Sequence, residues 1–250
     1  MSVKSRWIQN IAAAALFVGI IIYVLLFTTD NPRYHLIFDE WPKLLQALWT
    51  TLYISLISLV LCMTAGFGFY LLLKSRIPLI HALAVIFREI ILGTPMLVMI
   101  FLMVYVYGNL VGVTDKLVLG IAATTLYTMP YVANSYESAI SMIDREQYMV
   151  MDLYHFTGIQ KYLYVIFPQI AKPMLPALMN HLSGIIKGTA LLKIVSVPEI
   201  SYVLSAISSK NWASIEGYLV MWIMYLIVTI PLSSAAQYIG RRMKQDGDQT

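Results

Sequence analysis

Long apolar runs recur along the chain, separated by short polar segments. They cover residues 11–27, 48–73, 77 to about 110, 117–143, about 174–192 and 218–238. A helix needs about 20 mostly apolar residues to cross a hydrocarbon core of about 30 Å, whereas the strands of a membrane barrel are only about 10 residues long. The pattern therefore predicts an all-α, polytopic membrane protein of about six transmembrane helices.

Two of these runs have features that bear on their boundaries. The run 77–110 is divided by Leu92-Gly93-Thr94-Pro95, a sequence that interrupts a helix. The run 11–27 follows two basic residues, as the apolar part of a cleaved signal peptide does. It lacks a small-x-small cleavage site at its end, so we expect a retained helix.

Composition and charge agree with a membrane protein and orient it. Hydrophobic residues make up 59% of the chain and charged residues 12%, far from soluble globular usage. With the N-terminus in the cytoplasm, the cytoplasmic segments carry more Lys and Arg than the outer ones, which favours N-in and C-in. The cytoplasmic set is Lys4, Arg6, Lys74, Arg76, Arg145, Lys161, Lys172, Arg241, Arg242 and Lys244; the outer set is Arg33, Lys43, Lys116 and Lys210.

The net charge of +4 is thereby explained by topology and gives no case for a nucleic-acid partner. Cys62 is the only cysteine, which excludes an intrachain disulfide and leaves a cysteine-rich metal site unsupported.

The segment 144–170 is a polar interruption between the fourth and fifth runs, on the cytoplasmic side. Its pattern predicts two short helices. Asp144 is expected to cap the first helix and Thr157 the second, with Gln147 and Gln160 at the third helical positions. A turn then falls near residues 155–156, and Pro168 is expected to break the chain before the next span. The first helix mixes apolar and charged residues, which is typical of a helix lying on the membrane or docked on a protein partner.

The spacing of this segment resembles the cytoplasmic signature loop of the membrane subunits of bacterial ABC importers. In that family a Glu-Ala-Ala triplet is followed by a glycine and then by an apolar run ending in Pro. Aligned on Gln147 and on Phe167-Pro168-Gln169, the triplet falls on Met149-Val150-Met151 and the glycine on His155, and none of these four matches. Other landmarks of the polar amino-acid branch follow in order: Gly93-Thr94-Pro95, Leu175-Pro176 with Asn180, Lys187-Gly188-Thr189 and Val197-Pro198-Glu199.

The resemblance implies a five-helix permease core over 48–244, preceded by an N-terminal helix and linker, 1–47, and followed by a cytoplasmic tail, 245–250. It implies that the loop 144–170 forms a coupling helix in a groove of an ATPase. Apolar anchors and a polar rim suit such docking. The residues that the resemblance places in this coupling role are Gln147, Tyr148, Met149, Val150, Met151, Leu153, His155 and Pro168. Since glycine there permits a positive φ, His155 is expected to adopt that conformation.

The partners that the resemblance implies are two ATP-binding cassette ATPase subunits, an extracytoplasmic solute-binding protein, a second permease subunit in a homodimer or heterodimer, and the bilayer of the bacterial inner membrane. The chain has no G-x-x-x-x-G-K-[ST] phosphate loop, so ATP and Mg are expected on the separate ATPase and no cofactor or catalysis on this chain.

Polar residues inside the spans are the natural candidates for the substrate pathway, because they are costly in lipid and usually face an interior or a cavity. For Glu137 a salt bridge with Lys187 or a place near the headgroups competes with a role in the pathway. For His181 and Asn134, an interhelical hydrogen bond is the alternative to a role in the pathway. The candidates are Asn134, Glu137, Asn180, His181 and Lys187.

The implied substrate is a polar amino acid or a small derivative of one, with its charge left open, because several positions depart from the family's pattern. Two other classes stay in view. One is a regulatory or scaffold subunit that no longer transports, since the triplet and glycine are lost. The other is an ion-coupled secondary transporter, which usually shows internal repeats.

Overall fold

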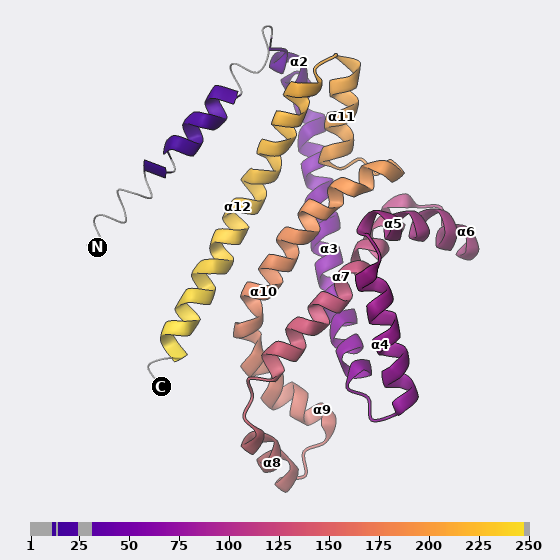
Figure 1. Ribbon diagram of the computed structural model, residues 1–250, viewed down its shortest axis with the longest axis vertical. Coiled ribbons are helices and arrows are strands. Elements are labelled where there is room, and N and C mark those ends of the chain that lie inside the picture. Colours follow the sequence, from indigo (N-terminus) through magenta and orange to yellow (C-terminus); the bar gives the residue numbers. More distant parts are fainter. Residues whose placement is uncertain (1–11, 14, 25–31, 248–250) are drawn as a thin grey trace.

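The protein is described by a computed structural model that covers residues 12–13, 15–24 and 32–247 (Figure 1). The described residues are almost entirely helical and contain no strand, which confirms the all-α prediction. After a helix over Ala15–Val24, the elements are α2 (Tyr34–Phe38), α3 (Trp41–Leu73), α4 (Pro78–Gly93), α5 (Met96–Phe101), η1 (Leu102–Tyr107), α6 (Gly108–Val111), α7 (Lys116–Ile140), α8 (Arg145–Leu153), α9 (Gly158–Gln160), η2 (Lys161–Ile166), α10 (Phe167–Gly188), η3 (Thr189–Val195), α11 (Ile200–Lys210) and α12 (Ser214–Gly247).

Helices α3 and α12 run along most of the length of the molecule and α10 lies between them, while α7 crosses α3 obliquely in the half nearer α8 (Figure 1). Helices α8 and α9 lie at one end, and α2 with the α11–α12 turn lies at the other. Helix α3 packs against α7 and α10, and α10 packs against α12. The contact between α3 and α7 is close because Gly66 has no side chain: a Cβ there would lie 2.9 Å from Val132. Small residues allow this kind of close approach between membrane helices.

Three apolar clusters fill the bundle in succession. The first joins α3, α7 and α10 near α8, and includes Phe69, Tyr136 and Ile170. The second joins the middle of α3 to α5, the start of α7 and η3. The third joins α2 and the start of α3 to α11 and α12. Each end of the bundle therefore has a packed core of its own.

The number of predicted spans, about six, agrees only loosely with the number of helices that could cross a membrane. Among the described residues, α3 and the part of α12 over Ser214–Arg241 are long and apolar enough to cross a membrane, and up to four spans result if two bent pairs count as one each. Helix α7 is 25 residues long, but its second half carries polar residues. The prediction for 11–27 lies partly outside the described residues, at positions 11, 14 and 25–27.

The predicted break at Gly93-Thr94-Pro95 is confirmed. Helix α4 ends at Gly93, and Thr94 and Pro95 have extended ψ angles of 125° and 138°. The helix axis bends by 108° between the stretches Pro78–Gly93 and Met96–Val111. Proline disfavours helical geometry in the residue before it, which accounts for the position of the bend.

The segment 144–170 forms the predicted first helix, α8, and the predicted turn. The chain leaves α8 through His155 at φ 55°, while the N–H groups of His155 and Phe156 donate to the carbonyls of Asp152 and Met151. These two bonds define a Schellman cap, in which glycine is the usual residue at the left-handed position. The positive φ expected of His155 is confirmed.

The predicted second cap is also confirmed. The Thr157 hydroxyl accepts from the Gln160 N–H at 3.3 Å, and the Gln160 side chain accepts from the Thr157 N–H at 2.8 Å. Asp144 occupies the predicted N-cap position of α8, but its side chain makes no capping bond there. The Gln147 side chain, expected to complete that cap, instead accepts a hydrogen bond from Gln169 at 2.8 Å.

Two expectations for this segment were wrong. The second helix is not short, because it continues without a break from Gly158 to Val195. Pro168 accordingly does not interrupt the chain before the span. It lies in the first turn of α10, directly after the π-helical turn η2. A wider π turn accommodates a proline that lacks an N–H and would otherwise crowd the carbonyl four residues earlier.

His155→Val is expected to weaken the cap of α8, because a β-branched residue is a genuine outlier at positive φ. The expected cost is about 1–2 kcal/mol, seen as faster hydrogen exchange of the α8 amides. His155→Gly keeps the turn and serves as the control, with exchange as slow as in the parent chain or slower. Equal exchange in the two variants would contradict a left-handed turn at this position.

Candidate functional site

The two sides of α8 differ sharply in exposure. Met151 is 2% exposed and points into the protein, whereas Met149, Val150 and Leu153 are 57%, 50% and 76% exposed. The expectation that Met151 anchors a partner is therefore corrected: it holds α8 to its own chain. The α8 outer face, defined as Met149, Val150 and Leu153, is the apolar surface that remains open to a partner.

Helix α8 is fastened to the membrane helices at several points. Tyr148 is half-buried and packs against the apolar cluster formed by α3, α7 and α10. Burial, with a smaller effect of the neighbouring Tyr162, raises the pKa of Tyr148 above its ordinary value. Gln147 bonds to Gln169 of α10, and Asp152 pairs with Lys161 of η2. These side-chain contacts connect α8 to η2 and α10.

A small polar cleft lies between α7 and α10. It has a volume of about 310 Å³, and the predicted pathway residue Asn134 lines it together with Ser135, Ser138, Ala139, Met142, Pro173, Met174 and Ala177. The His181 ring lies beside this cleft, with Nε2 2.8 Å from the Ser135 hydroxyl. The interhelical hydrogen bond considered for His181 is present, and it links the two helices that form the cleft.

The other pathway candidates lie outside the lining of this cleft. Glu137 pairs with Lys74, at the end of α3, with Nζ and Oε1 2.6 Å apart. The considered partner Lys187 is exposed near the end of α10, and Asn180 is also exposed. The structure therefore brings Asn134 and His181 together and leaves Glu137, Asn180 and Lys187 apart from them.

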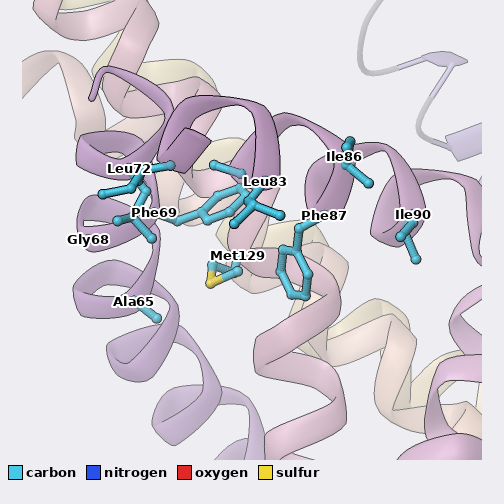
Figure 2. Close-up of a pocket in the computed structure, with 11 residues that line it drawn as sticks. Ala65, Gly68, Phe69, Leu72, Leu83, Ile86, Phe87, Ile90 and Met129 are labelled. Carbon is cyan, nitrogen blue, oxygen red and sulfur yellow. The ribbon is translucent and has the colours of Figure 1, made fainter. Parts of the chain in front are cut away.

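A much larger pocket is almost wholly apolar. It has a volume of about 740 Å³ and is lined by residues of α3 and α4 together with Met129 of α7. Figure 2 shows Leu83 and Phe87 of α4 beside Phe69 of α3 and Met129. The rings of Phe69 and Phe87 have centroids 5.7 Å apart. Because this lining has hardly any polar group, it suits hydrocarbon rather than a polar solute.

The carboxylate of Glu199, which belongs to the sequence landmark Val197-Pro198-Glu199, is buried at the other end of the bundle and connects its helices. Glu199 is 0% exposed, and its carboxylate accepts from the Ser201 and Tyr202 N–H groups and from the Tyr225 hydroxyl, at 2.9, 2.7 and 2.8 Å. It caps α11 and joins it to α12. The sequence signal for this role is an acidic residue directly before a helix start.

The described residues contain no group of three or more His, Cys, Asp or Glu placed to hold a metal ion. The polar chemistry of the membrane part is instead dispersed among hydrogen bonds between helices, as in the cleft and around Glu199.

Comparison with known proteins identifies relatives over most of the chain. One is the probable glutamine ABC transporter permease protein GlnM of Bacillus subtilis, 24% identical over 210 residues, which are 84% of this chain and 97% of that one. Another is the probable amino-acid ABC transporter permease protein PatM of Vibrio harveyi, 29% identical over 196 residues, or 77% and 87% of the two chains.

A solved structure titled "Crystal structure of an amino acid ABC transporter with histidines" matches with a TM-score of 0.74 and 24% identity, covering 85% of this chain and 99% of that one. An inward-facing structure of the MetNI methionine ABC transporter matches with a TM-score of 0.66 and 16% identity, covering 82% and 97%. These likenesses show that the helix bundle shares the fold of these two ABC transporter chains.

A family model described as "Binding-protein-dependent transport system inner membrane component" matches residues 65–245. This match takes in the bend after α4, the cleft between α7 and α10, the α8 segment and the buried Glu199. It covers well over half of the chain, and the chain therefore belongs to the family of binding-protein-dependent transport system inner membrane components.

Proposed function

We propose that the chain is the permease subunit of an ATP-driven importer for a polar amino acid or a small amino-acid derivative. The α8 outer face docks in a groove of a separate ATPase subunit, which binds ATP and Mg. The assembly contains two such ATPases, a second permease subunit, identical or related, and an extracytoplasmic solute-binding protein. The chain lies in the inner membrane with both termini in the cytoplasm.

The observation that carries this proposal is the two-sided construction of α8. Its inner side is fixed to α10 and to the apolar cluster by Gln147, Tyr148 and Met151, while its outer side exposes three large apolar side chains without a partner in the described chain. An exposed apolar patch on a rigid support favours a protein partner. Movement imposed on this face would reach the helices that form the polar cleft.

The size and lining of the cleft favour a small polar solute as the substrate. Its volume of about 310 Å³ falls at the lower end of the range of about 300–1,000 Å³ typical of small-molecule pockets. Asn134, Ser135 and Ser138 supply donors and acceptors there. Relatives named as glutamine and amino-acid permeases support the amino-acid class.

Uptake by proteoliposomes tests the proposal. Vesicles holding this chain, the ATPase encoded nearest to its gene and the matching binding protein should accumulate a labelled amino acid in an ATP-dependent, vanadate-sensitive manner. Accumulation without the ATPase would contradict the proposal and favour an ion-coupled transporter. A complex that forms and hydrolyses ATP but moves none of the amino acids would favour a regulatory or scaffold subunit.

A further inference from the structure

Trp212 occupies a backbone position that a tryptophan rarely takes. It follows α11 at φ 53°, and the Ala213 N–H donates to the Ser208 carbonyl at 3.0 Å. This is the left-handed position of a Schellman cap, where glycine is usual and a bulky L residue is strained. Its side chain is 86% exposed, more than any other large apolar side chain of the described residues. Packing against the other described residues does not offset this strain.

The turn that carries Trp212 is held in place on both sides. The Arg33 guanidinium donates to the Asn211 carbonyl at 3.2 Å, and the Arg33 N–H donates to the Glu216 carboxylate at 2.9 Å. Glu216 and Ala213, which flank the turn, are 4% and 0% exposed. The indole is thus presented from a fixed backbone. Because a tryptophan side chain has only two rotatable bonds, it loses little conformational entropy when it enters a partner's pocket.

The position of Trp212 along the bundle argues against a simple membrane anchor. The apolar run of α12 begins at Tyr218, and Ser214 precedes it by four residues, or about 6 Å along a helix. The headgroup layer adds only about 5–8 Å on each side of the hydrocarbon. Trp212 lies two residues further out than Ser214, at or beyond the outer edge of that layer. Tyr218, 61% exposed, is the better placed aromatic for the membrane interface.

Charged side chains surround this end of the bundle. Lys43 and Lys210 share the carboxylate of Glu40, with nitrogen–oxygen distances of 2.6 and 3.7 Å. Two ammonium groups on one carboxylate leave a positive charge, which the adjacent exposed Asp39 offsets. Arg33 lies beside the turn, and the carboxylate of Glu216 offsets its charge. Since these charges cancel, the complementary surface is an apolar pocket with a polar rim of mixed charge.

We propose that Trp212 is the central contact of this permease with its extracytoplasmic solute-binding protein, inserting into an apolar pocket with a polar rim. The inference rests on the proposed function, because it places that end of the bundle outside the cell and assumes a binding protein. It assigns to the strained α11–α12 turn the task of presenting the indole. Tryptophan is enriched among residues that dominate the energetics of protein interfaces.

Binding-protein-stimulated ATP hydrolysis in nanodiscs tests this contact. For Trp212→Ala, the binding-protein concentration that gives half-maximal stimulation should rise at least about tenfold, with basal hydrolysis unchanged. Trp212→Gly suits the left-handed backbone and should raise the half-maximal concentration by a similar factor, even if the alanine variant folds poorly. Trp49→Ala, which removes a 69% exposed tryptophan from α3, is the matched control and should leave the half-maximal concentration unchanged. An unchanged value in both Trp212 variants would overturn the inference.

Tryptophan fluorescence distinguishes an indole that contacts the binding protein from one that lies in the membrane. In a chain whose only tryptophan is Trp212, brominated lipids should quench the emission weakly, whereas added binding protein should shift it to the blue. Strong quenching by the lipids would place the indole in the bilayer and overturn the inference while leaving the proposed import function intact. A binding protein that fails to stimulate even the parent complex would overturn the proposed function, and the inference with it.

Discussion

Leu153→Asp is expected to abolish ATP-driven uptake while leaving the helix bundle folded. Leu153 is 76% exposed on the α8 outer face, so a carboxylate there remains hydrated in the free chain. In a docked complex the same carboxylate would be buried in an apolar groove, at a cost of several kcal/mol unless it finds a partner. Copurification of the ATPase should fall by at least about tenfold, which corresponds to about 1.4 kcal/mol.

Leu153→Met is the matched control, because it keeps an apolar side chain of similar volume and should keep both copurification and uptake. Thermal unfolding of the isolated permease should be the same for the parent and both variants. Normal uptake by the aspartate variant would exclude Leu153 from the docking surface. Met151→Asp would not serve here, since Met151 is buried within the chain and the charge would destabilise α8 itself.

Glu199→Ala is expected to give the largest loss of stability. It leaves the Ser201 and Tyr202 N–H groups and the Tyr225 hydroxyl without their buried acceptor. Removing one partner from a buried hydrogen-bond network costs about 3–5 kcal/mol. For a chain of this size the midpoint of thermal unfolding in detergent should fall by roughly 6–20 °C.

Glu199→Gln keeps an acceptor oxygen and should lose clearly less than the alanine variant. Glu89→Ala removes a carboxylate that is 63% exposed on α4 and should leave the unfolding midpoint nearly unchanged. If the Glu199 and Glu89 alanine variants unfolded at the same temperature, the carboxylate of Glu199 would not hold α11 to α12.

The helical class, the break after α4 and the turn at His155 could be predicted because each depends on local sequence. Apolar length indicates a membrane helix, a proline sets the bend, and the spacing of the caps locates the turn. The number of spans could not be predicted from apolar length alone, because α7 mixes apolar and polar residues. Its polar second half lines the cleft and pairs with neighbouring helices, which hydropathy alone does not reveal.

Side-chain direction in short helices and pairing between distant helices could not be predicted in the same way. Met149, Val150, Met151 and Leu153 are all apolar, and a helix of 9 residues offers too few turns to show which side faces the core. The Glu137–Lys74 pair joins residues 63 positions apart. Such contacts depend on the packing of α3 against α7, which no local pattern encodes.

The π turn η2 has a consequence for the alignment of the two working ends of α10. A π turn holds one more residue than the α turn it replaces, and because that residue is taken up within one wider turn, the helix that follows keeps its angular phase. Deleting one residue within Lys161–Ile166 is therefore expected to restore α-helical winding with Gln169 and His181 in the same phase relative to α8, whereas a deletion in α10 between them would rotate His181 by about 100° relative to Gln169. The chain can therefore be one residue longer or shorter at η2 without changing the phase between the cytoplasmic segment and the cleft.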